Sequence, residues 1–201
     1  MRLNSQRPNN GFRTLIMQTA TIDRSKEWTV EDFLLLEESN LPCELINGEL
    51  FMSPAPSLIH QVVIGNLYEI LKSYSRKTGG FAGISPLDVF LDQKNVFQPD
   101  ILFILKENRS RLTDRGIEGA PDLAIEVISP SNSFKDRNQK KNLYQKFGVI
   151  EYWIIDPGNK TLEIYDFVSG ENPVLYLAEE GDVTSKLLPN LSFRFADLFI
   201  P

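Results

Sequence analysis

Short runs of apolar residues, each about the length of one strand, constrain the fold of this chain most. Residues 101–105 and 123–128 are apolar at almost every position, which is typical of central strands covered on both faces. A helical segment from Ser57, which has an apolar stripe at helical spacing and stops at Gly79-Gly80, precedes them. A second helix is expected from Ser131 or Ser133 to Phe147. The order of these segments predicts an α/β fold with a mixed central sheet flanked by helices.

The remaining segments add a short helix, a hairpin and further strands. Thr29 predicts a helix start and Ser39-Asn40 its end, and Asn47-Gly48 predicts a hairpin within Leu41–Ser53. A strand-rich C-terminal extension is expected over Val174–Leu188 and Leu191–Phe195. The other expected strands are Phe81–Asp92, Val96–Leu105, Asp122–Ser129, Glu151–Asp156 and Thr161–Phe167.

Length and composition fit an ordinary globular protein. The 201 residues suffice for one sizeable core, and we expect a single domain over 28–201 after a flexible N-terminal tail over 1–27. Cys43 is the only cysteine, which excludes a disulfide scaffold and favours the cytoplasm. No apolar run approaches the roughly 18 residues of a membrane helix. The net charge of −6 does not suggest a nucleic-acid partner, although residues 135–146 are locally basic.

Two acids interrupt the apolar strands. Alternation places Asp100 on the face of Leu102 and Ile104, and Glu126 on the face of Ala124 and Ile128. A buried carboxylate is costly unless a cation or a water-filled cleft receives it, and two on adjacent strands would repel each other. A Mg²⁺ or Mn²⁺ ion between them would resolve both problems. Asp122 shares the face of Glu126 but lies about 13 Å away along the strand, so we expect it to be a strand-entry residue.

A lysine also occupies an unexpected position. On a helical wheel Lys140 lies at the centre of the stripe formed by Leu143, Tyr144 and Phe147, whereas Lys141 points to the side. A lysine aimed into a sheet needs a carboxylate or a phosphate as its partner. Beside a metal, its ammonium could position the attacking water or neutralise charge developing on a phosphoryl group.

Each of these residues also has a plain structural interpretation. Asp100 and Glu126 could be exposed strand ends or partners of arginines such as Arg109 and Arg115, and Lys140 could pair with Asp136 at i,i+4. His60, the only histidine, lies in the first turn of its helix facing inward, where a hydrogen-bonded core histidine is commoner than a ligand. Glu44, Tyr144 and Trp153 could be a solvated carboxylate and two core aromatics. Their joint occurrence carries more weight than any one of them.

The combination resembles a known nuclease family. Pro99-Asp100, followed by Glu126 on the next strand within a helix–strand–strand–strand–helix–strand order, resembles the core of PD-(D/E)XK nucleases. Over about residues 29–200 the chain is similar to the Uma family of restriction-endonuclease-like proteins. The motifs that carry this similarity are Pro121–Ser131, Asp136, Lys140, Tyr144, Gly148-Val149, Glu151–Pro157, and upstream Glu44–Glu49, Met52-Ser53-Pro54 and His60.

The resemblance implies a metal-dependent phosphodiesterase. Asp100 and Glu126 would bind Mg²⁺ or Mn²⁺ together with the Val127 carbonyl, and Glu44 and His60 would line the cleft. The third motif position is Ile128 instead of lysine. The family is thought to move this lysine to the following helix, which would make Lys140 the substitute, in agreement with the helical wheel.

Three functional hypotheses remain open at this stage. The first is an endonuclease that cuts DNA, in which a water activated by the metal attacks phosphorus and Lys140 acts as electrostatic helper or proton shuttle. A homodimer would suit two cuts in a duplex. The second is an inactive module that binds nucleic acid or protein on a nuclease-like scaffold, and the third is a purely structural metal site.

Overall fold

The computed structural model describes residues 26–36, 43–53, 55–129, 135–170 and 175–201. Most of the predicted tail over 1–27 lies outside these ranges, as do the expected helix end at Ser39-Asn40 and the expected helix start at Ser131 or Ser133. Among the described residues, no helix is both long enough and apolar enough to cross a membrane.

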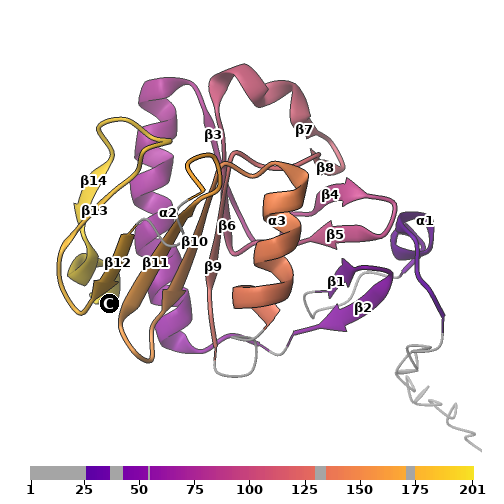
Figure 1. Ribbon diagram of the computed structural model, residues 1–201, viewed down its shortest axis with the longest axis horizontal. Coiled ribbons are helices and arrows are strands. Elements are labelled where there is room, and N and C mark those ends of the chain that lie inside the picture. Colours follow the sequence, from indigo (N-terminus) through magenta and orange to yellow (C-terminus); the bar gives the residue numbers. More distant parts are fainter. Residues whose placement is uncertain (1–25, 37–42, 54, 130–134, 171–174) are drawn as a thin grey trace, which may run out of the picture.

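A six-stranded central sheet forms the middle layer (Figure 1). Its strands β9 and β10 are parallel, and its other neighbouring strands are antiparallel. In spatial order the strands are β12 (Leu175–Ala178), β11 (Thr161–Asp166), β10 (Glu151–Asp156), β9 (Leu123–Val127), β6 (Ile101–Ile104) and β3 (Phe81–Ile84).

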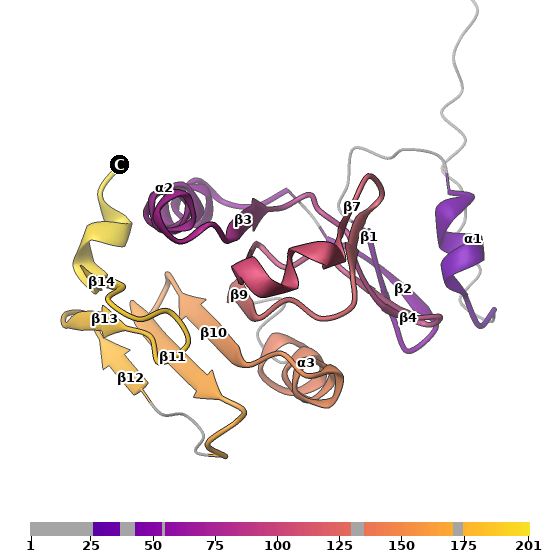
Figure 2. The ribbon, with the colours of Figure 1, turned by 90° about the horizontal axis from the view of Figure 1, so that it is seen from above.

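Helices cover the two faces of the central sheet, with α2 on one side and α3 on the other (Figure 2). Helix α2 (Leu58–Thr78) is capped by the Ser57 hydroxyl and ends at Gly79, whose φ of 80° suits glycine. Its buried residues pack with Ile101, Phe103 and Ile125. On the other face Leu143 and Tyr144 of α3 (Lys141–Phe147) pack with Ala124 and Ile128. The predicted class of mixed sheet between helices is therefore confirmed.

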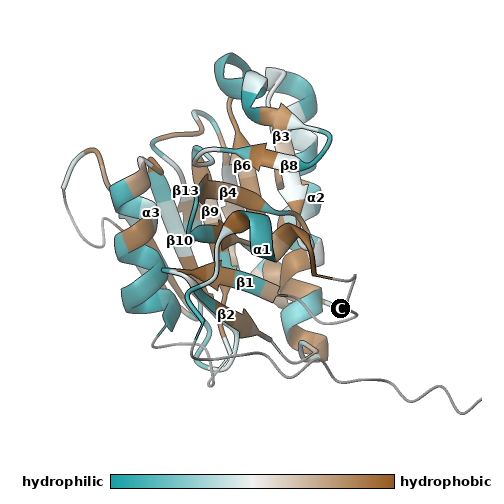
Figure 3. Cartoon of the chain, turned by 90° about the vertical axis from the view of Figure 1, so that its right-hand side faces the viewer, coloured by the Kyte–Doolittle hydropathy of each residue, from teal (hydrophilic) through white to brown (hydrophobic). Residues whose placement is uncertain are grey.

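A second sheet, the side sheet, lies next to the central sheet, and α1 (Val30–Leu34) packs on it (Figures 1 and 3). The Asn47-Gly48 hairpin is confirmed between its first two strands. Helix α1 starts after Thr29, as predicted, with a capping box formed by Thr29 and Asp32, but it ends at Leu34, earlier than expected. The side sheet contains, in spatial order, β2 (Glu49–Met52), β1 (Cys43–Ile46), β5 (Asn95–Phe97), β4 (Val89–Asp92), β8 (Gly116–Glu118) and β7 (Leu112–Thr113).

Two strands expected to be continuous are divided between the sheets. The run 81–92 becomes β3 in the central sheet and β4 in the side sheet, and the run 96–105 becomes β5 and β6 in the same way. Pro86 and Pro99 lie at the breaks, and proline cannot donate to a strand ladder. Asp100 therefore lies where the chain crosses from the side sheet into the central sheet.

The C-terminal part is rich in strands, as expected. Besides β12 it contains the pair β13 (Asp182–Thr184) and β14 (Ser192–Arg194), followed by the 3₁₀ helix η3 (Phe195–Phe199). Two further short helices are the 3₁₀ helix η1 (Lys106–Arg111) and the π-helix η2 (Lys135–Lys140), which leads directly into α3.

Candidate active site

Asp100 and Glu126 lie opposite each other on neighbouring strands. The antiparallel register of β6 and β9 pairs Ile101 with Ile125 and Leu102 with Ala124. Continuing this register by one residue places Asp100 across from Glu126, where Cβ atoms are typically about 5 Å apart. The register thus puts both acids on one face of the central sheet, as their alternation predicted.

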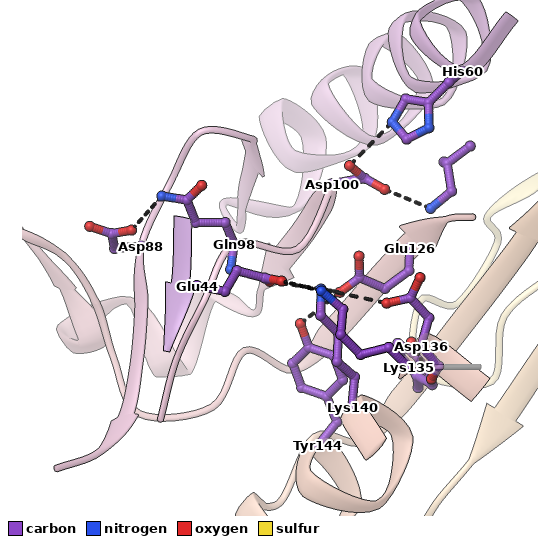
Figure 4. Close-up of polar contacts among 12 residues, drawn as sticks. Glu44, His60, Asp88, Gln98, Asp100, Glu126, Lys135, Asp136, Lys140 and Tyr144 are labelled. Carbon is purple, nitrogen blue, oxygen red and sulfur yellow. Dashed lines mark hydrogen bonds and ion pairs between the residues drawn. The ribbon is translucent and has the colours of Figure 1, made fainter. Parts of the chain in front are cut away.

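Lys140 points into the molecule toward these acids (Figure 4). Its side chain is only 4% exposed, and its Nζ lies 2.9 Å from Glu126 Oε1, 2.7 Å from Glu44 Oε1 and 3.7 Å from Asp136 Oδ1. The i,i+4 pair with Asp136 therefore exists, but it is buried inside a larger cluster. The position inferred from the helical wheel is correct.

The turn that carries Lys140 is a π-helix, and this brings in a residue that the sequence analysis missed. In a regular α-helix Lys135 would lie about 140° from Lys140. A π-turn joins residues five apart, and Lys135 here lies 3.1 Å from Glu44 Oε2 while Lys140 holds Oε1 of the same carboxylate. The sequence signal that could have revealed Lys135 is its spacing of five residues from Lys140, just before the regular helix.

Glu44 reaches this cluster from the side sheet. It lies on β1, is 5% exposed, and also accepts a hydrogen bond from the backbone N–H of Gln98. Burial would raise the pKa of its carboxyl, but the charges of Lys140 and Lys135 outweigh burial and lower the pKa. Glu44 is therefore an ionised member of the cluster and not the solvated strand carboxylate of the plain alternative.

The pKa of Glu126 shifts in the opposite direction. Burial, which Lys140 offsets only in part, holds the pKa of its carboxyl well above the ordinary value, and Asp136 and Asp100 raise the pKa further. The hydroxyl of Tyr144 donates to the same Oε1 that Lys140 contacts. Tyr144 is thus more than a core aromatic, because it fixes the orientation of this carboxylate.

Asp100 is more open, with 19% of its side chain exposed. Its Oδ2 accepts a hydrogen bond of 2.7 Å from the backbone N–H of Val127, and its Oδ1 lies 3.3 Å from His60 Nε2. Figure 4 shows His60 reaching this carboxylate from α2. The inward direction inferred for His60 is correct, and both predicted accessory residues, Glu44 and His60, contact a predicted catalytic residue.

The alternative arginine partners lie elsewhere. Arg109 donates to the carbonyls of Gly79 and Gly80, and Arg115 pairs with Glu118. Asp122 is a strand-entry residue, as expected.

The donor set fits a hard divalent cation. The cluster combines the carboxylates of Glu44, Asp100, Glu126 and Asp136 with the ammonium groups of Lys135 and Lys140, which leaves an excess of negative charge. Carboxylate oxygens are the ligands that Mg²⁺ and Mn²⁺ prefer. Within the described ranges no three His, Cys, Asp or Glu side chains form a ready-made metal cage. Two carboxylates and a backbone carbonyl suit Mg²⁺ nonetheless, because this ion usually keeps several waters.

Comparisons with known proteins bear on the family and the fold of this chain. A family model named Uma2 and described as "Putative restriction endonuclease" matches residues 30–196. A crystal structure described as that of "a putative nuclease belonging to DUF820" from Anabaena variabilis superposes with a TM-score of 0.70 at 22% identity, over 85% of this chain and 97% of that one. Among curated proteins no match was found. The structural similarity concerns the fold, and the family model covers most of the chain.

Proposed function

This chain belongs to the Uma2 family of restriction-endonuclease-like proteins, and we propose that it is an endonuclease that hydrolyses phosphodiester bonds of DNA with Mg²⁺ or Mn²⁺. The main support is the position of Lys140. Its buried ammonium contacts Glu126 directly, and the strand register places Asp100 opposite Glu126. Two acids and a lysine that meet on one sheet face can hold a divalent ion and stabilise the charge that develops in phosphodiester hydrolysis.

Each residue has a defined role in this proposal. Asp100, Glu126 and the Val127 carbonyl would hold the ion, which supplies Lewis-acid stabilisation of charge on the phosphoryl oxygens. Lys140 neutralises negative charge that develops on the phosphoryl group. The neighbouring acids raise the pKa of Lys140 well above its ordinary value despite burial, which favours this electrostatic role over that of a proton shuttle. His60 and the Val127 N–H orient Asp100, and Tyr144 orients Glu126.

The proposal is tested by cleavage of supercoiled plasmid DNA with Mg²⁺, with Mn²⁺ and with EDTA. The variants Asp100→Asn and Lys140→Gln are compared with Asp114→Asn and Lys146→Gln, which alter exposed residues of the same types. Nicking that needs the ion, disappears in the first pair and persists in the second supports the proposal. Equal nicking by all variants would identify a contaminating nuclease, and no nicking by folded wild type on DNA or RNA would overturn the proposal.

A non-catalytic binding module is the second candidate, and the ion pairs favour it in one respect. Lys140 already forms ion pairs with both Glu44 and Glu126, so the negative charge of the cluster is partly balanced without a metal. This candidate predicts nucleic-acid binding that weakens with salt and no turnover with any divalent ion.

Light scattering of the same samples, with and without DNA, tests the predicted homodimer.

A further inference from the structure

A cavity of about 630 Å³ lies next to Arg137 of η2. Its walls come from Arg137 of η2, the ends of β9 and β10, the turn between β10 and β11, and the edge strand β12. The residues used below are Ser129, Arg137, Asp156, Asn159, Thr161 and Tyr176.

Strand register links this cavity to the candidate active site. Glu126 is paired with Ile154, Ile154 with Glu163, and Glu163 with Tyr176. These four residues form one row across the central sheet on the same face. Three strand spacings amount to about 14 Å, so Tyr176 lies within a few nucleotides of Glu126 at about 3.4 Å per nucleotide.

The carboxylates around the cavity are occupied by partners of their own. Asp156 accepts hydrogen bonds from the backbone N–H groups of Gly158 and Asn159 and from the Asn159 side chain. Glu163 accepts from Arg137 at 2.6 Å and from the Tyr165 hydroxyl. The ion pair with Arg137 removes most of the repulsion that Glu163 would exert on a nucleic-acid strand.

Tyr176 is the distinctive group of the cavity. It is 58% exposed, and it is the only Phe, Tyr or Trp among the exposed large hydrophobic residues of the described ranges. Polar side chains of Ser129, Asn159 and Thr161 line the same cavity. An exposed aromatic ring beside hydroxyl and amide groups suits a nucleobase, whose face stacks and whose edge forms hydrogen bonds.

We propose that this cavity is a subsite for one unstacked base of the substrate strand, a few nucleotides from the bond at Glu126, with the base stacked on Tyr176. The proposal rests on the nuclease function and deepens it, since it assigns a single-stranded or overhanging segment to the substrate. Tyr176 is a binding residue here and takes no part in the chemical step.

Binding of fluorescein-labelled single-stranded DNA, measured by anisotropy without divalent ions, tests the subsite in the full chain. Tyr176→Ala should weaken binding about tenfold, the lower part of the range for loss of one base stack. Tyr176→Phe keeps the ring, and Val168→Ala trims another exposed side chain, in the turn after β11, so both should bind like wild type. A second readout is the quenching of 2-aminopurine in the oligonucleotide at saturating protein, which Tyr176→Ala should reduce.

The outcomes separate this proposal from the nuclease function. If wild type cleaves DNA and Tyr176→Ala matches it in affinity and quenching, the subsite is wrong and the nuclease function stands. If Tyr176→Ala and Val168→Ala weaken binding equally, the loss is not specific to the ring and the subsite is also wrong. Wild type that neither binds nor cleaves any nucleic acid would overturn both.

Discussion

Two buried acids lie near opposite ends of β9, and they differ in the partners that surround their carboxylates. Asp122, 2% exposed, precedes the strand and receives hydrogen bonds from the Leu105 N–H at 2.7 Å and the Asn108 side chain at 2.6 Å, with Arg111 at 3.3 Å. Glu126, 4% exposed, has Lys140 and Tyr144 as partners but shares its surroundings with three other carboxylates. Burial therefore does not distinguish a structural acid from a functional one. What distinguishes them is the number of hydrogen-bond donors around each carboxylate compared with the number of neighbouring acids.

The largest expected effect is on catalysis. Asp100→Asn should reduce metal-dependent DNA nicking at least about a hundredfold, because it weakens the ligand set of the ion. Asp122→Asn should retain nicking at a temperature where the variant is folded, which circular dichroism checks. Equal loss in both variants would remove the distinction between the two acids.

The free energy of unfolding should depend more on Asp122 than on Glu126. Asp122→Ala leaves three donors without their acceptor and should cost about 3 kcal/mol, a fall in Tm of about 6–12 °C. Glu126→Gln removes one of several crowded carboxylates and leaves Lys140 with Glu44, so its cost should stay below about 1 kcal/mol. Thermal unfolding of both variants in EDTA measures the difference, and a larger loss in Glu126→Gln would contradict it.

Metal binding should stabilise the folded protein through Asp100 and Glu126 and should not depend on Asp122. At ten times its Kd, Mn²⁺ should add about 1.4 kcal/mol, or about 3–5 °C in Tm. Asp122→Asn should keep this shift, and Asp100→Asn should lose most of it. A fall in Tm of wild type on adding EDTA alone, with no effect on DNA cleavage, would instead identify a structural ion.

The smallest expected effect is on the reactivity of Cys43, whose thiol senses the charges of Glu44 and Asp88. Burial raises the pKa of its thiol to about 11, and the charges of Glu44 and Asp88 contribute. Only the thiolate reacts with iodoacetamide, so alkylation should be slow at pH 8 and speed up about tenfold per pH unit below pH 10. Glu44→Gln should accelerate alkylation a few-fold and Asp122→Asn should not, as mass spectrometry can follow.

The sequence predicted the acids well because strand alternation is local information. The register of β6 and β9 places Asp100 and Glu126 together, as their positions in the two apolar runs required. Alternation does not show which sheet a strand joins, and the runs 81–92 and 96–105 were each wrongly taken as one strand. Pro86 and Pro99 were visible warnings of those breaks.

The failure to predict Lys135 has a different explanation. A wheel of 100° per residue assumes regular α-helical geometry, and η2 departs from it. Lys140 was placed correctly because Leu143 and Tyr144 follow it in the regular helix α3. Lys135 was missed because a π-turn depends on what the helix packs against. Glu44 comes from a separate sheet, and only the family resemblance predicted it in the cleft.

One consequence follows from the way Lys140 joins Glu44 of the side sheet to Glu126 of the central sheet. Lys140 thus connects the two sheets by ion pairs, in addition to the catalytic role that we propose for it. A related protein that no longer cleaves DNA could still keep Lys140 for this contact between its two sheets. Retention of the lysine in a related sequence is therefore no proof of nuclease activity. Loss of the more exposed Asp100, in contrast, would indicate that the activity has been lost.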